Sequence, residues 1–209
     1  TRQLILFLKN SIYSFSGMLA IFLTGIALGS MFINRFVDKL KTPLVVFGMS
    51  ELAIGLISIF NLHLLLPLHN KLYPLYDVSS PLSRGLLWNY LAPTILVFPL
   101  TFLFGAIFPI ASLCYAKSAE ESGSSVGRLY GFNTIGNVMG ALFTGFLFIS
   151  LIGSSAMIIL LGFANVALGL FLIYSEPHKL TVFKTKFLLI IPCVIFLSLG
   201  FKNKDPFLK

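Results

Sequence analysis

The chain has 209 residues, of which 57% are hydrophobic and only 11% charged, and its mean hydropathy is +0.94. Soluble domains carry about a quarter charged residues, so this composition indicates a membrane protein and excludes an intrinsically disordered chain or a secreted disulfide scaffold. The formal net charge is +8. Because the basic residues interrupt long apolar runs instead of forming one patch, we expect the lipid bilayer as a partner and no nucleic acid.

A hydrocarbon core about 30 Å thick requires roughly 20 mostly apolar residues per helix. The apolar runs over residues 1–175 therefore predict an all-α fold, a polytopic transmembrane helix bundle with five to six spans. The clear spans cover residues 12–33, 43–66, 86–116, 129–149 and 155–174. Residues 176–209 are predicted to form a basic loop and a short apolar run, 187–201, which is a spanning helix, a re-entrant piece or a span cut short.

The span at 86–116 is unusual, because it is too long for one straight helix and too short for two. It contains Pro93, Pro99 and Pro109. Each proline lacks a backbone N–H and clashes with the carbonyl four residues earlier, so helix kinks are predicted at these positions. Broken helices often line substrate sites in transporters, but proline is also frequent in membrane helices, and both interpretations stay open.

All 15 Lys and Arg residues lie outside the cores of the predicted spans. When the loops are assigned alternately to two sides and the C-terminal tail is set aside, one side holds more basic residues. These are Arg35, Lys39, Lys41, Lys117, Arg128, Lys179, Lys184 and Lys186, against Arg2, Lys9, Lys71 and Arg84. The positive-inside rule predicts that loops 34–42, 117–128 and 175–186 are cytoplasmic, in a bacterial-type inner membrane. Thr1 then lies outside, so we expect a further helix upstream of it.

An internal repeat is visible in two pairs of spans. The segment Glu51–Phe60, ELAIGLISIF, resembles Asn165–Tyr174, NVALGLFLIY. The preceding spans share a Tyr-x-Phe start, at Tyr13 and Tyr130, followed later by Thr-Gly. Since the charges give the two pairs opposite orientations, we predict inverted three-helix repeats of the kind found in secondary transporters. The span at 86–116 then opens the second repeat, and its counterpart is a first helix missing from the chain.

Glycine spacing predicts close helix packing. Small residues four apart lie on one face of a helix and let two backbones approach closely. The glycines predicted to pack in this way are Gly25, Gly29, Gly131, Gly136, Gly140 and Gly145. Tight packing without transport would explain all of them equally well.

Glu51 is the only acidic residue inside a predicted span. A charged carboxylate there costs at least about 2–3 kcal/mol, so it should be paired, protonated or in contact with water. Proton coupling, binding of a cationic ligand, and a structural hydrogen bond to a neighbouring helix are the alternatives. Asn133, Asn137 and Asn165 complete the candidate intramembrane polar site, with interhelical hydrogen bonds as their structural interpretation.

Three strings resemble the multi-pass membrane region of membrane-bound spermidine synthase-like, or polyamine aminopropyltransferase-like, proteins. Tyr13–Ser30 resembles the second helix of that region. Leu103-Phe-Gly-Ala-Ile-Phe-Pro-Ile-Ala111 is similar to the family's Gly-Ala-Thr-Phe-Pro segment. Val126-Gly-Arg-Leu-Tyr-Gly-Phe-Asn-Thr-Ile-Gly136 is similar to its Val-Gly-Arg-Leu-Tyr-Ala-x-Asn-Thr-x-Gly. The resemblance covers roughly residues 1–175 and implies a bundle like half of a major facilitator transporter.

In that family a soluble transferase domain, which binds decarboxylated S-adenosylmethionine, follows the membrane region. No string in this chain corresponds to its Gly-rich acidic loop or its catalytic Asp. We therefore expect no catalytic residue, no cofactor and no aminopropyl transfer in this chain alone, although the full-length family would be a transferase. Cys114 and Cys193 lie in apolar runs without metal-ligand spacing, so no metal site is predicted.

Three functions follow as hypotheses. The resemblance implies an integral membrane module of a spermidine synthase-like protein of polyamine biosynthesis, with a soluble synthase domain or the rest of its own chain as partner. The repeat and Glu51 instead suggest a secondary-transporter-like module for a small cationic solute such as a polyamine. The glycine pattern alone allows a structural membrane scaffold.

Overall fold

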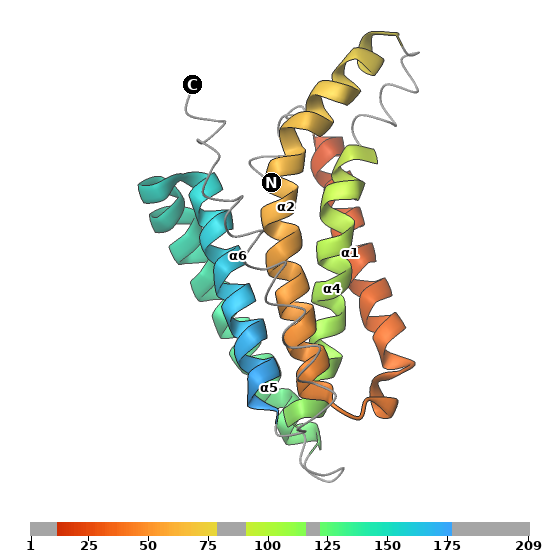
Figure 1. Cartoon of the computed structure of the whole chain (residues 1–209), viewed down its shortest axis with the longest axis vertical. Helices are drawn as coiled ribbons and strands as arrows, with labels where there is room; N and C mark the ends of the chain where they lie inside the picture. Colours follow the sequence, from red (N-terminus) through yellow and green to blue (C-terminus); the bar gives the residue numbers. More distant parts are fainter. Residues whose placement is uncertain (1–11, 79–90, 116–121, 177–209) are drawn as a thin grey trace.

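The computed structural model describes residues 12–78, 91–115 and 122–176, and within these ranges the chain is helical throughout apart from short turns, with no strand (Figure 1). The prediction of an all-α fold is therefore confirmed. The elements are α1 (Ile12–Asn34), the 3-10 helix η2 (Val37–Lys39), α2 (Pro43–Val78), α4 (Ala92–Tyr115), α5 (Ser122–Leu142), the π-helical segment η4 (Phe143–Phe148) and α6 (Ile149–Ser175).

Four helical stretches are long and apolar enough to cross a membrane. They cover Phe15–Asn34, Pro43–Leu65, Pro93–Tyr115 and Gly123–Ser175. The first three correspond to the spans predicted at 12–33, 43–66 and 86–116. Apart from Asn34, every residue of these three stretches lies inside its predicted span. These helices indicate a multi-pass integral membrane protein.

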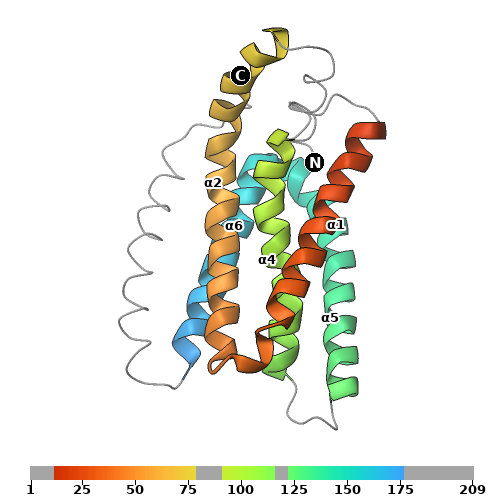
Figure 2. The ribbon, with the colours of Figure 1, turned by 90° about the vertical axis from the view of Figure 1, so that its right-hand side faces the viewer.

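The fourth stretch is a helical hairpin. Its 53 residues would extend about 80 Å as one straight helix, more than twice the thickness of a hydrocarbon core. The chain reverses at Gly153, which has φ 81° and ψ 163°, a backbone conformation that glycine adopts without a steric penalty. The segments predicted as spans 129–149 and 155–174 thus become the two antiparallel arms of this hairpin (Figure 2).

One helix end differs from the predicted spans. Helix α2 continues to Val78, twelve residues past the predicted end at 66, and extends beyond the other helices in Figure 1. Residues 67–78 include two prolines and several polar residues, so neither hydropathy nor helix propensity predicts this extension. Of the span predicted at 86–116, α4 covers Ala92–Tyr115. Residues 86–90 of that predicted span, the run 187–201, and the N-terminal residues 1–11 lie outside the described residues.

The prolines of α4 occupy different positions in the helix. Pro93 lies in the first turn, where a missing N–H has no intrahelical partner to lose and proline does not bend the helix. Pro99 and Pro109 lie inside α4, which runs as one helix from Ala92 to Tyr115. Any kink therefore belongs to the two interior prolines.

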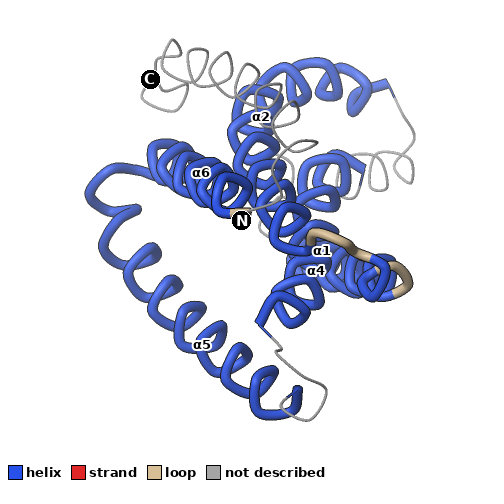
Figure 3. Tube along the Cα trace, turned by 60° about the horizontal axis from the view of Figure 1, so that its bottom comes forward, coloured by secondary structure: helices blue, strands red, loops and turns tan. Residues whose placement is uncertain are grey.

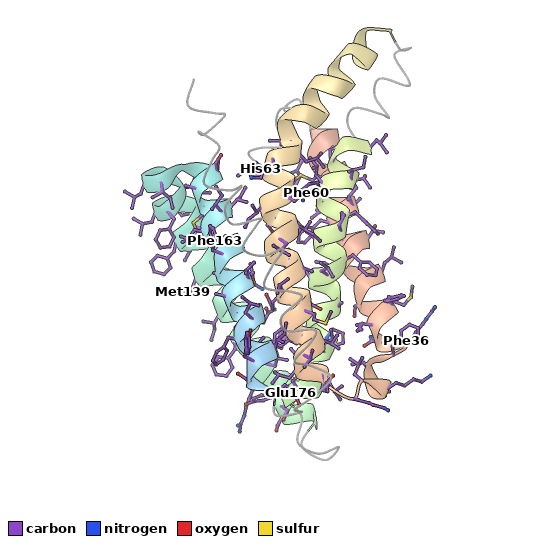
Figure 4. All side chains as sticks on the ribbon, viewed as in Figure 1. Phe36, Phe60, His63, Met139, Phe163 and Glu176 are labelled. Atoms are coloured by element: carbon purple, nitrogen blue, oxygen red, sulfur yellow. The ribbon has the colours of Figure 1, made fainter. Side chains whose placement is uncertain are left out.

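The helices pack mainly as two pairs joined through α2. Helix α1 packs along α4, α2 packs along α6, and α2 also contacts α4. Figure 3 shows α5 standing apart from this group, connected through the hairpin to α6. The C-terminal ends of α1 and α6 lie at the same end of the bundle, as Phe36 and Glu176, labelled in Figure 4, show.

Glycines bring the backbones of α1 and α4 into direct contact. A Cβ atom added at Gly25 would overlap the side chain of Thr101, and one at Gly29 would overlap the carbonyl of Phe102. On the α4 side of the contact, a Cβ at Gly105 would overlap the carbonyl of Ile26 in α1. The structure therefore places two of the six predicted packing glycines, Gly25 and Gly29, at an interface where no side chain fits.

The contact between α2 and α6 uses glycines from both helices. A Cβ at Gly48 would lie 2.7 Å from the carbonyl oxygen of Gly169, and one at Gly55 would lie 2.5 Å from that of Gly162. Both distances are well below van der Waals contact. Buried side chains adjoin these glycines and form the core of the pair: Val45, Leu52, Val166 and Ile173.

The glycines of α5 have no such neighbours. At Gly131, Gly136, Gly140 and Gly145, an added Cβ would meet nothing within 4 Å among the described residues. The close packing expected of these four positions is therefore not found in this part of the chain. Glycine spacing identifies a helix face that allows close approach, but it does not identify the helix that makes it.

We predict that Gly55→Leu destabilises the bundle and that Gly140→Leu, its matched control on α5, does not. The leucine side chain introduced at position 55 would displace the α6 backbone, and overpacking of this kind costs typically about 1–3 kcal/mol or more. The measurement is thermal unfolding of the purified protein in detergent, followed by loss of the monodisperse peak in size-exclusion chromatography. Equal melting temperatures for the two variants would contradict the observed α2–α6 contact.

Candidate functional site

The candidate site centres on Glu51 in α2. The side chain is only 8% exposed and lies within the membrane-spanning stretch Pro43–Leu65. Gly48 and Gly55, the two glycines of α2 that touch α6, lie about one helical turn before and after it. Glu51 is therefore held at the middle of the tightest helix contact that α2 makes.

No described residue compensates the Glu51 carboxylate. Among residues 12–78, 91–115 and 122–176, neither a hydrogen bond nor an ion pair reaches it. A charged group in a dry helix bundle is costly unless it is paired, so stability alone does not explain an acidic residue at this position. The structural interpretation of Glu51, a hydrogen bond to a neighbouring helix, finds no partner in this part of the chain.

Glu51 lies on the flank of α2 between its two neighbours. The row that faces α6 contains Gly48, Leu52 and Gly55. Asn61, whose side chain reaches α4, lies about 80° around the helix from Glu51, on the flank turned away from α6. Glu51 is therefore on the side of α2 that borders both α4 and α6.

Asn165 in α6 lies at the same depth as Glu51. Gly162 and Gly169, which contact Gly55 and Gly48, lie about one turn on either side of it. Its Nδ2 donates a hydrogen bond to the carbonyl of Leu161, 2.9 Å away in the same helix. Asn165 therefore makes an intrahelical bond, not the interhelical bond that its structural interpretation assumed.

Asn133 and Asn137 are not part of this site. Both side chains are exposed on α5, and no interhelical hydrogen bond from either is found within the described ranges. Helix α5 contacts α4 at Tyr130, whose ring meets that of Phe108 edge-on with a centroid distance of 6.2 Å. The structure thus brings together Glu51 and Asn165 and leaves the other two asparagines apart from them.

An interhelical hydrogen bond of the bundle comes from a residue that the sequence did not single out. Asn61 donates from Nδ2 to the carbonyl of Leu96 in α4, at 2.7 Å. The two residues are 35 positions apart in the sequence. A polar residue inside span 43–66 was the available signal.

No metal centre is formed by the described residues, because they contain no group of three or more His, Cys, Asp or Glu side chains placed to hold an ion. His63, labelled in Figure 4, lies on α2 about three turns beyond Glu51 and so is not part of the same site. The chemistry available at Glu51 and Asn165 is that of oxygen acceptors in a low-dielectric environment, which suits a cation.

Comparison with known proteins finds no matching family, no similar curated protein and no similar solved structure.

We predict that Asn61→Leu lowers the stability of the bundle by roughly 0.6–2 kcal/mol, the range of interhelical hydrogen bonds in membranes. The matched control is Ser50→Ala, because Ser50 Oγ bonds only to Val46 of its own helix, at 3.0 Å. Thermal unfolding in detergent measures both variants. A melting temperature for Asn61→Leu equal to that of the control would show that the Leu96 carbonyl finds another donor.

Proposed function

We propose that this chain is a secondary-transporter-like membrane module that binds a small organic cation, such as a polyamine, at Glu51. The observation that carries the proposal is a largely buried acidic side chain beside the α2–α6 contact, for which the described residues supply no hydrogen bond or ion pair. An ionisable residue inside a membrane bundle is expensive, so it indicates a ligand, a proton or an ion as its functional partner.

The architecture proposed for this module is an inverted repeat, in which α1–α2 corresponds to the hairpin of α5 and α6. Shifting α2 by 114 positions aligns it with α6 and matches, in order, four of its buried residues. Gly48, Leu52, Gly55 and Ile59 fall on Gly162, Val166, Gly169 and Ile173, all of which are buried.

The contacts between the two helices follow the same relation. Gly48 touches Gly169 while Gly55 touches Gly162, so exchanging each residue for its counterpart converts one contact into the other. A contact with this property is self-complementary, as at a two-fold axis between identical subunits. It supports the repeat predicted from the segments at 51–60 and 165–174.

A cation is the ligand that fits an uncompensated carboxylate. Its positive charge would offset the cost of burying Glu51, and an ammonium group would supply hydrogen-bond donors that the described residues do not. The same reasoning covers a proton, which neutralises the carboxylate directly. Transport of a cation in exchange for protons would use both states of Glu51, the carboxylate that binds the cation and the protonated carboxyl group.

We predict that Glu51→Gln strongly reduces uptake of labelled spermidine into proteoliposomes. The substitution keeps the shape of the side chain and removes its charge, and loss of a charged hydrogen bond of about 1.5–3 kcal/mol reduces the initial rate by about tenfold or more. Ser58→Ala is the matched control, because Ser58 lies two turns along α2 and its Oγ bonds to Ile54 of the same helix at 2.7 Å.

Stability separates this role from a structural one. Because the buried carboxylate has no partner among the described residues, Glu51→Gln should leave the melting temperature in detergent unchanged or raise it. Unchanged spermidine flux in Glu51→Gln would exclude Glu51 from the mechanism. A lower melting temperature would assign it a structural partner instead.

The family resemblance supports a second proposal, an integral membrane module of a spermidine synthase-like protein. The strings Tyr13–Ser30 and Leu103–Ala111, which carry two of the three resemblances, contact each other where Gly105 meets Ile26, and Gly25 and Gly29 of the first string meet Thr101 and Phe102, directly before the second. Two segments identified independently in the sequence therefore form one packing unit. In this proposal the chain anchors a synthase domain or delivers substrate to it, and loops 34–42, 117–128 and 175–186 face that domain in the cytoplasm.

This second proposal predicts a Rossmann-type aminopropyltransferase domain in the same or the adjacent coding sequence. Reading the genomic sequence on both sides of the codons for Thr1 and Lys209 tests it directly. A locus without any methyltransferase-like domain would remove its main support and leave the transporter-like proposal unaffected.

A further inference from the structure

We infer that Asn165 of α6 is the second ligand-binding residue of the Glu51 site, and that the acceptor pair binds one primary ammonium group. The inference rests on the proposed function, since it names a partner residue for the same carboxylate. It depends on three features of the structure: the depth of the two residues, the side of the helix pair on which they lie, and the hydrogen bonding of the Asn165 amide.

The two residues lie level with each other in the bundle. The contacts Gly48–Gly169 and Gly55–Gly162 are separated by seven residues on each helix, which is about 10 Å of helix axis. Glu51 and Asn165 each lie between these two contacts. Because the backbones touch both above and below them, the helices cannot diverge at the level of the site.

Both side chains lie on the same side of the helix pair. Glu51 immediately precedes Leu52, and Asn165 immediately precedes Val166, so each is rotated back by about 100° from a core residue of the contact. Helices α2 and α6 run in opposite directions. A rotation of the same sense about two antiparallel axes moves both side chains toward the same side of the plane containing the axes.

That side faces the rest of the bundle. Asn61 lies further around α2 in the same rotational sense and bonds to α4, so α4 packs on the side of the pair where Glu51 and Asn165 lie. The opposite side of the pair is the outer surface with respect to α4. The two residues therefore lie on the side of the pair where α4 packs, with Glu51 buried and Asn165 partly exposed.

The amide of Asn165 has an acceptor free for a ligand. Its Nδ2 donates to the carbonyl of Leu161, and among the described residues no donor reaches its Oδ1. With the Glu51 carboxylate, the pair offers the two carboxylate oxygens and Oδ1 as acceptors, against the one N–H of Nδ2 that the bond to Leu161 leaves over. A primary ammonium has three N–H donors and no acceptor, so it matches this set, whereas an anion does not.

The equivalence of the two positions gives a specific expectation. Glu51 and Asn165 differ by the same 114 positions that relate the glycines of α2 to those of α6. If the site lies on the pseudo-two-fold axis, the carboxylate functions from either helix. The charge can then be moved across the contact without loss of the site.

The experiment measures binding and uptake of labelled spermidine in a set of transposition variants. We expect Glu51→Asn to lose binding by about tenfold or more, and the double variant Glu51→Asn with Asn165→Glu to recover most of it. Glu51→Asn with Asn133→Glu is the matched control, because it restores the same net charge on α5, outside the site, and should remain inactive.

Single substitutions at Asn165 keep the inference testable if the double variant does not fold. Asn165→Leu should weaken spermidine binding by about fivefold to tenfold, since a hydrogen bond to a charged group contributes about 1.5 kcal/mol, while Asn165→Asp should retain it. The control Asn137→Leu removes an asparagine from α5 and should change nothing.

The outcomes distinguish this inference from the proposed function. An inactive but monodisperse double variant, or wild-type binding in Asn165→Leu, would overturn the role of Asn165 and leave Glu51 as a lone carboxylate site. Wild-type binding in Glu51→Asn would instead overturn the proposed function itself. Recovery in the Asn133→Glu control would show that net charge alone, and not position, restores binding.

Discussion

The contact between α2 and α6 depends on the absence of side chains at four glycines. In a bilayer, lipid tails are as apolar as leucine, so helices gain no hydrophobic free energy by leaving lipid for each other. Association then depends on close backbone approach, which maximises dispersion contacts. Gly48, Gly55, Gly162 and Gly169 supply that approach, and α1 and α4 use the same device at Gly25, Gly29 and Gly105.

The position of the candidate site follows from this contact. Two backbone contacts about 10 Å apart clamp α2 against α6, and the polar residues lie between them. Such a clamp fixes the spacing of the two helices at the level of Glu51. The bundle can therefore hold a destabilising carboxylate at a fixed depth, because the cost is offset by packing elsewhere on the same two helices.

Much of the fold was predictable because hydropathy reports directly which residues contact lipid. The span at 12–33 ends within one residue of the end of α1 at Asn34, and the segments at 129–149 and 155–174 were separated near the turn at Gly153. The extension of α2 to Val78 was not predictable in this way, since outside the bilayer a helix needs no apolar residues.

Pairing between helices was the harder problem. Six glycines were expected to pack, yet only Gly25 and Gly29 meet another helix among the described residues, and the contacts of Gly48 and Gly162 were not foreseen. Spacing along one helix does not contain the identity of its partner. The hydrogen bond from Asn61 was missed for the same reason, because its acceptor, the carbonyl of Leu96, lies in a helix distant in sequence.

The matched rows of α2 and α6 have a consequence for how such a protein can arise. The contact surface of either helix could pack in the same way against an antiparallel copy of itself. In α2, for example, Gly48 would then meet Gly55 of the copy, because Gly48 meets Gly169, the counterpart of Gly55 in α6. A half-length ancestor that inserted into the membrane in both orientations would therefore dimerise through this surface before any fusion. Under the proposed inverted repeat, gene duplication would have only to fix one copy in each orientation, and the interface would require no new contacts.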